Sequence, residues 1–412
     1  MKVFKFGGAS VKDAESVKNV ANVLSKEANG KTVVVISAMG KMTNAFENIV
    51  HAYFNQTETL KDTIDYVYNF HLDIIQELFK DTTKTEIATN FIDQLQVFLN
   101  DNSIEDYNYV YDQIVGYGEL ISTSIVSAYL ESIGCLNNWI DVRTLIKTDD
   151  SYRDAKVNWD TTLKNIEQHS FENLTITQGF LGGCGSDTTT LGREGSDFTA
   201  GIFAYCLDAD TVTIWKDVNG VLNAHPKHFD DTTLLENISY KEAIEMAYYG
   251  ASVIHPKTLK PLENKLIPLR VRSFYNLENQ GTLVSKGEDV IPKVPCFILK
   301  QNQILVSIST ADFSFMVEHH LSDVFNKLHE NRLKVNLVQN SALSFSVCIE
   351  DKFGNFQAFF ESVKKDYKVY YNTDTTLYTI RHYTKEAIAE IEQKGTVLLK
   401  QASRETVQIV IE

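Results

Sequence analysis

The sequence predicts an α/β protein, with a mainly parallel sheet between helices and two small α+β modules after it. Three observations support this prediction. The chain opens with an apolar strand, a glycine turn, a helix and a second apolar strand, as parallel sheets do. Strand-like and helical segments then alternate, and the order strand, helix, strand, strand occurs twice near the end. A chain of 412 residues is also longer than a single hydrophobic core typically accommodates, so we expect two domains.

In the first domain, expected at residues 1–290, hydrophobic periodicity sets the elements. Residues 2–6 predict a short buried strand that stops at two glycines, and residues 16–30 predict a helix that ends at Gly30. Residues 44–133 are mostly helical in pattern. The other expected strands are 32–40, 139–142, 174–182, 210–218, 266–274 and 281–285, and a further helix is expected at 241–251.

A linker is expected at residues 286–296, because this segment carries charges, a glycine and two prolines. The second domain, residues 297–412, contains the weak repeat. A helix at 356–366 and a strand at 367–372 would complete its first unit, whereas the second unit stops before its closing helix. The four elements of the first unit are 304–309, 317–331, 334–340 and 344–350, and those of the second are 377–382, 385–394, 396–401 and 406–412.

The composition argues against several kinds of partner. The formal net charge is −15, and nucleic-acid binding needs clustered Lys and Arg. The first residues lack the apolar core of a signal peptide and no run approaches a membrane-spanning length, so we expect no membrane association and a cytoplasmic location. Five scattered cysteines form no CxxC pair, so neither a disulfide framework nor a zinc site is predicted, and no residue is assigned as a metal ligand.

Two glycine-rich segments are candidate phosphate-binding turns. Gly7 and Gly8 follow the first strand, and residues 179–195 hold several glycines after another strand. Glycines let backbone amides approach phosphate oxygens, although tight turns without ligands are at least as common. Neither a Walker loop nor a GxGxxG sequence is present. Charged residues beside or within the turns strengthen the interpretation as binding sites.

Each of these charged or polar residues also has a purely structural explanation. Lys5 could be a lysine reaching out from a sheet edge, but the glycine amides that follow favour a phosphate contact. Glu119 begins an apolar helix and would interact with its dipole, while Ser196 and Asp197 suit helix caps. Arg193, set between glycines, is harder to explain as mere surface, because its planar fork suits a carboxylate or a phosphate.

Taken together, the motifs resemble those of aspartate kinases, within the amino acid kinase superfamily. The matching segments, in the family's order over most of residues 1–285, are KFGGAS, GELIST, TQGFLG with TTLGREGSDFTA, IWKDVNGVLNAHPK and EMAYYGASVIHP. The tail is similar, less closely, to the paired ACT modules of that family. The resemblance implies ATP-dependent phosphorylation of the side-chain carboxylate of L-aspartate. The product would be 4-phospho-L-aspartate, on the way to lysine, threonine and methionine.

The chemistry of this reaction agrees with the residues present. A carboxylate is already ionised at neutral pH, so no general base has to activate it. The difficulty is to bring one anion up to the anionic γ-phosphate, which requires positioning and charge neutralisation. Lys5, glycine amides and Mg²⁺ would supply both, so ATP and Mg²⁺ are the implied cofactors.

The resemblance assigns a role to each matched residue. Lys5 would stabilise the transferring phosphoryl group, and Asp197 would orient Lys5 rather than remove a proton. Arg193 would bind the α-carboxylate of aspartate, and Glu119 would pair with its ammonium group. The other implied substrate-binding residues are Ser37, Thr43, Asn44, Phe180 and Ser196. The implied nucleotide-binding residues are Lys5, Gly7, Gly8, Trp215, Lys216, Asp217, Gly220, Val221, Leu222 and Lys227.

The sequence departs from the family pattern near both predicted ligands. The family's GAKVLHP motif has a lysine that contacts ATP phosphates, and Ser252 stands at that position here. Lys216 replaces the usual threonine of WTDVDG, and we hypothesise that it supplies the lost charge. Ala9 and Glu194 replace a threonine and a glycine, and Glu194 would have to point away from phosphate.

The predicted regulatory modules depart further. His319 stands where such modules often have a glycine that admits an amino acid, and Asn336 replaces the aspartate of lysine-sensitive relatives, while Ser341 is retained. Asn336 still accepts a hydrogen bond, but loss of the charged partner weakens recognition of an effector. We expect a homodimer through these modules and leave amino-acid feedback open.

Two other functions remain open from the sequence. One is a sister kinase that acts on acetylglutamate, glutamate or a nucleotide, although Glu119 and Arg193 favour a free amino acid. The other is an inactive amino-acid sensor. Ser252 motivates that reading, and the retention of Lys5 and Asp197 argues against it.

Overall fold

The structure, a computed structural model, describes residues 1–79, 82–251, 254–287, 290–312 and 314–412. The chain divides into two compact units. The first consists of Met1–Val221, Leu234–Ile244 and Ile254–Asp289, and the second of Leu222–Thr233, Glu245–Val253 and Val290–Glu412. Two short segments of the region expected as the first domain therefore group with the C-terminal unit.

The first unit is built on a mainly parallel sheet. Its strand order is β8-β10-β9-β7-β1-β2-β4-β3, and among these neighbours only β9 and β10 are antiparallel. The strands are β1 Lys2–Phe6, β2 Thr32–Ile36, β3 Asn138–Ile140, β4 Leu174–Gln178, β7 Thr211–Lys216, β8 Asn237–Ser239, β9 Leu269–Ser273 and β10 Thr282–Ser285. A separate antiparallel hairpin consists of β5 Leu181–Cys184 and β6 Asp187–Thr190.

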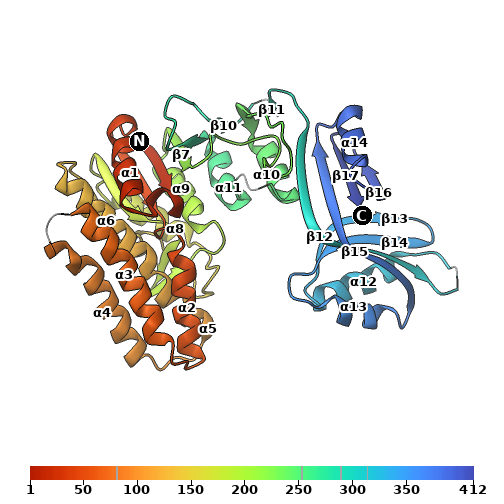
Figure 1. Ribbon diagram of the computed structural model, residues 1–412, viewed down its shortest axis with the longest axis horizontal. Helices are drawn as coiled ribbons and strands as arrows, with labels where there is room; N and C mark the ends of the chain where they lie inside the picture. The colour runs from red at the N-terminus through yellow and green to blue at the C-terminus, as the bar shows by residue number, and fades with distance from the viewer. Residues whose placement is uncertain (80–81, 252–253, 288–289, 313) are drawn as a thin grey trace. The chain divides into compact units, whose positions relative to one another are not determined.

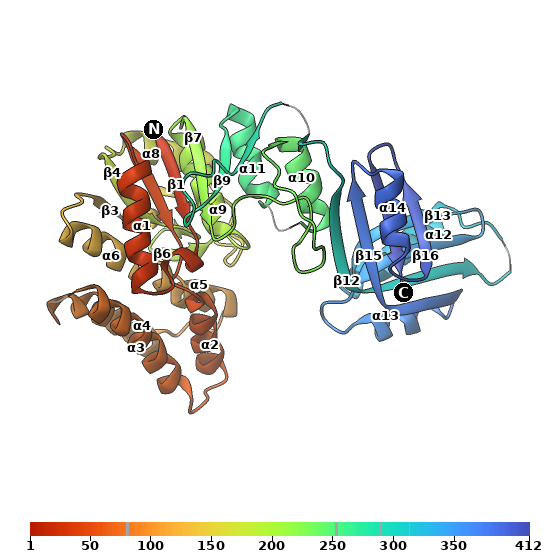
Figure 2. The same ribbon diagram turned by 45° about the horizontal axis from the view of Figure 1, so that its top comes forward.

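Helices cover both faces of this sheet. Helix α9 packs on β1, β2 and β7, while α6 packs on β2, β3 and β4. Helices α2, α3, α4 and α5 lie together, as Figures 1 and 2 show. The helices of the unit are η1 Gly8–Val11, α1 Ala14–Glu27, α2 Met42–Phe54, α3 Leu60–Leu78, η2 Thr82–Thr85, α4 Glu86–Asp101, α5 Tyr107–Val115, α6 Tyr117–Ser132, α7 Val142–Leu145, α8 Trp159–Gln168, α9 Gly195–Cys206 and α11 Pro256–Lys265, with α10 Tyr240–Tyr249 at its boundary.

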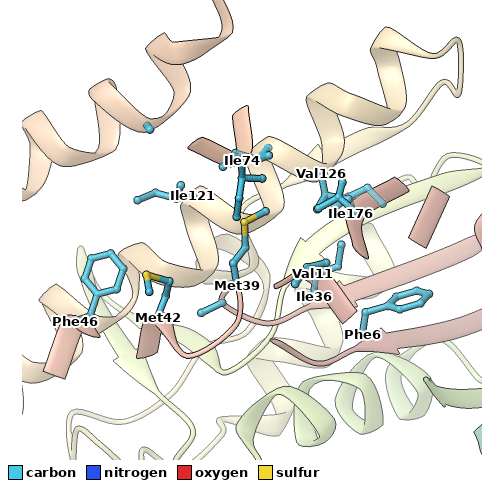
Figure 3. Close-up of a cluster of buried hydrophobic side chains, with 14 of the residues drawn as sticks. Phe6, Val11, Ile36, Met39, Met42, Phe46, Ile74, Ile121, Val126 and Ile176 are labelled. Carbon is cyan, nitrogen blue, oxygen red and sulfur yellow. The ribbon is translucent and has the colours of Figure 1, made fainter. Parts of the chain in front are cut away.

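One large apolar core joins the sheet to the helices of residues 44–133. Phe6 of β1 and Ile36 of β2 belong to the same buried cluster as Ile121 of α6, and Met39 and Phe46 continue the cluster into α2, as Figure 3 shows. All five side chains are almost completely buried. Alternation along a strand therefore leaves Lys5 on the opposite face of the sheet, towards α9.

The second unit contains one six-stranded sheet of order β13-β14-β12-β15-β17-β16. Figure 1 shows α12 and α13 together and α14 apart from them. Its elements are β11 Val290–Ile291, β12 Cys296–Thr310, α12 Glu318–Glu330, β13 Lys334–Asn340, β14 Ser344–Glu350, α13 Phe356–Val363, β15 Tyr367–Arg381, α14 Lys385–Glu392, β16 Val397–Ala402 and β17 Thr406–Ile411. These elements confirm the predicted fold class of a mainly parallel α/β sheet followed by two small α+β modules.

The two modules share their long strands, which the sequence did not predict. The expected strands 367–372 and 377–382 are one continuous strand, β15, and β12 extends eight residues before the expected start at residue 304. The N-terminal half of β12 pairs with the C-terminal half of β15. The second module has only α14 as its helix, and Phe229 packs on Phe297 in its core, with ring centroids 4.9 Å apart.

Within the described residues no helix is both long and apolar enough to span a membrane. The predicted departure at Ser252 lies outside the described residues, so the structure gives no position for it.

His71 makes the stability of the fold sensitive to acid. It is fully buried in α3, where its Nδ1 lies 2.8 Å from the carbonyl oxygen of Val67 and its Nε2 finds no hydrogen-bond partner in the described part of the chain. Burial lowers the pKa of His71 from 6.5 to about 4. The unfolded chain therefore binds a proton that the folded chain rejects, and stability falls as the pH drops from 6.5 towards 4.

We expect the free energy of unfolding to decrease by up to about 3 kcal/mol across this range, from the difference between the two pKa values. His71→Gln should remove most of this loss, and His51→Gln, at an exposed position of α2, should leave it in place. Urea unfolding at several pH values measures both. An unchanged pH dependence in His71→Gln would refute the assignment.

Candidate active site

Lys5 is a buried cation in the middle of the parallel sheet. In β1 it stands between Val35 of β2 and Ile214 of β7, and its side chain is only 11% exposed. A charge in this position needs a partner, because desolvation penalises it. Asp197, in the first turn of α9, supplies that partner, with 2.6 Å between Lys5 Nζ and Asp197 Oδ1.

The turn after β1 allows a close approach of two backbone segments. A Cβ atom on Gly8 would lie 2.5 Å from the carbonyl oxygen of Gly40 and 2.8 Å from that of Ala38, so only glycine fits. A Cβ atom on Gly7 would lie 3.3 Å from Lys5 Nζ. The main chain of these glycines is therefore open towards Lys5, as a phosphate-binding turn requires.

Glu119 is a buried carboxyl group with one unsatisfied oxygen. It lies in the first turn of α6 and is 2% exposed. Its Oε1 accepts a hydrogen bond of 3.2 Å from the backbone N–H of Ala38, while Oε2 has no hydrogen-bond partner among the residues that the structure describes. Burial raises the pKa of Glu119 to about 8, although the Ala38 amide and nearby Lys5 act in the other direction. A cationic ligand group would stabilise the charged form.

The second glycine-rich segment is strained at two residues that carry side chains. Phe180 and Glu194 both have left-handed backbones, with φ of 70° and 55°. A Cβ atom on Gly195 would lie 2.6 Å from the ring of Phe180, and the Phe180 amide donates a 3.0 Å hydrogen bond to Thr199 Oγ1. Such backbone strain gathers at functional sites, where the surrounding structure enforces it.

These features meet around one cavity of about 270 Å³ in the first unit. Its lining combines the strand ends of the sheet, the start of α6 and the start of α9. The predicted site residues that line it are Lys5, Gly8, Ser37, Thr43, Glu119, Phe180, Ser196 and Asp197. The fold thus brings together predicted site residues that lie up to 192 positions apart in the sequence, from Lys5 to Asp197.

Three predicted residues lie beside the cavity without lining it. Gly7 is next to Gly8, and Asn44 is exposed in the first turn of α2. Arg193 is exposed in the loop between β6 and α9, although its neighbours Gly192 and Glu194 line the cavity. An arginine at that point would have to turn inwards to contact a ligand.

The predicted nucleotide segment begins at the end of β7. The side chain of Trp215 is only 1% exposed, and its ring lies 5.6 Å from that of Phe4 and 6.0 Å from that of Phe6. In this position it is part of the core and cannot stack on a base. Lys216, Asp217, Gly220 and Val221 follow in the first unit, and Leu222 and Lys227 belong to the second.

The predicted effector residues lie in the second unit. Asn336 accepts a 2.8 Å hydrogen bond from Lys300 Nζ and donates one of 2.7 Å to Gln303 Oε1. Ser341 is in the turn between β13 and β14, where the Ser344 amide donates to its Oγ. Both polar groups are therefore engaged within the protein.

Five lining residues were not among the predicted site residues: Ala38, Gly40, Gly192, Glu194 and Gly195. Gly192 and Gly195 belong to the glycine-rich segment 179–195 that was predicted as a candidate phosphate-binding turn, whereas the only sequence signal of Ala38 and Gly40 is their place after a strand. Glu194 had a stronger signal, because it interrupts a glycine-rich run, but we expected it to point away.

The fold and the site together define a class of protein. Glycine turns and a buried lysine lie at the carboxyl ends of parallel strands, where α/β proteins bind their ligands. In a comparison with models of protein families, residues 1–273 match the amino acid kinase family. The chain belongs to the amino acid kinase family.

Individual relatives point to one branch of this family. The chain is 30% identical over 366 residues to aspartokinase 1, chloroplastic, of Arabidopsis thaliana, covering 84% of this chain and 63% of that protein. It is 29% identical to lysine-sensitive aspartokinase 3 of Escherichia coli strain K12, covering 84% of this chain and 78% of that protein. The crystal structure of E. coli aspartokinase III with lysine and aspartate is similar, with a TM-score of 0.84, 25% identity and coverage of 100% and 96%.

Glu194 provides a direct test of the strain in this loop. A left-handed residue with a side chain costs about 1 kcal/mol or more relative to glycine. We expect Glu194→Gly to be more stable than Glu194→Ala by about 1 kcal/mol, since both lose the carboxylate and only the first relieves the backbone. Thermal unfolding of the two variants measures this difference. Equal stabilities would contradict the assigned strain.

Proposed function

We propose that the protein is an aspartate kinase, which transfers the γ-phosphoryl group of ATP to the side-chain carboxylate of L-aspartate. The observation that carries the proposal is the buried Glu119 with an unpartnered oxygen, in the same cavity as the Lys5–Asp197 ion pair and Gly8. A carboxyl group of this kind suits an ammonium group, and a lysine beside bare amides suits a phosphate. The similarity to aspartokinases supports the same substrate.

In this proposal the amino acid is held by its charged groups. The ammonium group pairs with Glu119 Oε2, which offsets the cost of its burial. The exposed Arg193 turns over the cavity and binds the α-carboxylate through its planar fork. Ser37, Thr43, Phe180 and Ser196 line the space around the substrate, and Asn44 lies next to Thr43.

Phosphoryl transfer then needs alignment of the two anions rather than proton removal. Lys5 approaches the transferring group, while the Gly7 and Gly8 amides bind phosphate oxygens. Asp197 holds the Lys5 ammonium in place through their 2.6 Å ion pair. The aspartate side chain attacks as a carboxylate, so no general base is required.

A kinase of this family uses ATP with a metal ion, and we propose Mg²⁺. Among the described residues no group of three His, Cys, Asp or Glu side chains is arranged to hold a metal. Glu194 and Asp197 do line the cavity, and Mg²⁺ binds well to one or two carboxylates together with substrate phosphates. The residues therefore fit an ion that arrives with ATP, and bound Mg²⁺ would neutralise phosphate charge.

The nucleotide would lie along the residues that follow β7. We propose that Lys216 supplies the cation missing at Ser252, and that the buried Trp215 contributes only backbone. Lys216→Ala should then raise the KM for ATP about tenfold, the loss expected for one charge-assisted contact. Lys265→Ala, which removes a lysine paired with Asp208, is the control and should leave this KM unchanged. An unchanged KM in Lys216→Ala would remove the proposal.

The second unit is proposed to form a homodimer and to receive an amino-acid effector, in a cytoplasmic enzyme. E. coli aspartokinase III was crystallised with lysine, which supports the effector. The engagement of Asn336 by Lys300 and Gln303 disfavours strong lysine binding, because an effector would have to displace both contacts. Titration of activity with lysine and threonine, singly and together, tests the regulation.

A hydroxamate assay with ATP and Mg²⁺ tests the proposed function. Acyl phosphate formation with aspartate, and none with glutamate or acetylglutamate, is the expected result. Activity with glutamate alone would identify a sister kinase. Lack of activity with every acceptor would favour an amino-acid sensor.

Glu119 should give substrate binding a characteristic pH dependence. The empty protein holds this carboxyl group largely protonated at pH 7, since its pKa is about 8. Binding of an ammonium group requires the carboxylate, so affinity for aspartate should rise as the pH increases from 7 to about 8. Glu119→Gln should abolish this rise and weaken binding at pH 8 by about tenfold or more.

Glu194→Gln is the matched control, because it removes another carboxylate from the same cavity. It should keep the rise with pH. Titration calorimetry between pH 6.5 and 8.5 measures the dependence. A rise that persists in Glu119→Gln would show that another group binds the ammonium.

A further inference from the structure

The loop that carries Arg193 and leads to Ser196 in the first turn of α9 begins immediately after a strand held by one buried carboxylate. Asp112, in α5, is completely buried. Its Oδ2 accepts hydrogen bonds from the backbone N–H of Thr190, at 2.7 Å, and of Arg153, at 2.9 Å. Its Oδ1 accepts a third from Thr190 Oγ1, at 2.7 Å. Donors from two separate segments thus converge on a single side chain.

These contacts lie along the edge of the hairpin that faces α5, where side chains of the helix bond the backbone of β6. In its two-stranded sheet, β6 pairs with β5 alone. On its other side Gln113 of α5 donates a 2.8 Å hydrogen bond to the carbonyl oxygen of Thr188 and accepts one of 3.0 Å from its amide. Two residues on, Asp112 accepts from the amide of Thr190 in the same direction. Side chains of α5, together with the Ala155 amide that donates a 2.9 Å hydrogen bond to the carbonyl oxygen of Thr190, therefore take the place of a third strand.

The second segment bound by Asp112 supports the start of the loop. Tyr152 and Arg153 are both left-handed, with φ of 40° and 56°, so this turn is strained and needs an anchor. The next residue, Asp154, lies against Gly192, where a Cβ atom would be 2.5 Å from Asp154 Oδ1. Asp112 consequently fixes Gly192 from both directions, along β6 and through the turn.

We propose that Asp112 is a positioning residue for the amino-acid substrate, which acts through Thr190 and Arg153 to set residues 191–196, the loop after β6 and the first residues of α9. The identity of the substrate rests on the proposed function, whereas the placement of the loop does not. The residue does not touch the cavity. Its effect reaches the substrate through Arg193 and Ser196.

The chemistry of the site supports a positioning role over simple packing. Burial raises the pKa of Asp112 to about 6, although its hydrogen bonds and Arg153 act against the rise. A buried carboxylate is costly, and an apolar side chain would fill the same space more favourably. The carboxylate offers several acceptor sites in fixed directions, which an apolar side chain cannot do.

Asp112→Asn tests the proposal with almost no change of volume. The amide would place a donor against the Thr190 and Arg153 donors, so the loop would lose its anchor. We expect the KM for aspartate to rise at least about tenfold while the KM for ATP and kcat change less than about twofold. Tyr111→Phe is the control, because Tyr111 lies in the same helix as Asp112 and the substitution removes only its 2.6 Å hydrogen bond to Glu47. It should leave both KM values and kcat unchanged.

Hydrogen exchange gives a readout that needs no substrate. Amides of residues 188–196 should exchange faster in Asp112→Asn than in the unaltered protein, with residues 17–24 of α1 unaffected. If Asp112→Asn does not fold, Thr190→Val removes only the hydroxyl contact and should show a smaller change in both measurements. Absence of kinase activity in the unaltered protein would refute the proposed function, and exchange would still decide the role of Asp112.

Two results would overturn the inference. One is unchanged exchange of residues 188–196 in a folded Asp112→Asn protein. The other is an equal rise of both KM values together with faster exchange throughout the first unit, which would show a general structural role.

Discussion

The ion pair between Lys5 and Asp197 is the contact on which the candidate active site depends. A lysine in the central strand of a buried sheet is tolerated only with a counter-charge close by, and the first turn of α9 supplies it at 2.6 Å. That requirement fixes where α9 begins relative to β1. Because the loop of residues 191–194 leads directly into α9, it also fixes that loop above the strand ends. The pair and its helix thereby define one wall of the cavity.

Close backbone contact is the second constraint, and it explains why glycines surround the cavity. Gly8 lies against the carbonyl groups of Ala38 and Gly40, and Gly195 lies against Phe180. In both places a Cβ atom would be nearer than 3 Å to its neighbour. The glycines are thus required by the packing of the empty protein, and the same packing leaves amides without side chains in front of them. The same glycines are therefore needed for packing and, in the proposed function, for ligand binding.

Much of this arrangement could be predicted from the sequence, because its signals are local. Strands β1, β13 and β14 have the predicted limits or nearly so, since apolar alternation bounded by turn residues specifies them. Most of the predicted catalytic and substrate-binding residues share one cavity, because parallel strands bring their carboxyl ends to one edge, whereas the predicted nucleotide and effector residues, apart from Lys5 and Gly8, do not line it. Hairpin β5–β6 was missed, since its glycines and threonines look like a turn. The shared strand β15 was missed for a related reason: polar residues 372–376 interrupt its apolar pattern, while its pairing with β12 depends on distant residues.

Under the proposed function, the charges around the cavity would allow an acidic protein to accept two anions. Lys5 and Asp197 compensate each other, and Glu119 is neutral in the empty protein because burial raises its pKa. When an ammonium group binds, Glu119 ionises against it, so this pair adds no net charge either. Glu194 is the one remaining carboxylate among the lining residues. In the proposed function, the positive potential that attracts the two anions would come from the glycine amides, from Arg193 at the α-carboxylate, and from Lys216 and the metal at the nucleotide. Placement of the loop that carries Arg193 is then as important for binding as any charge inside the cavity.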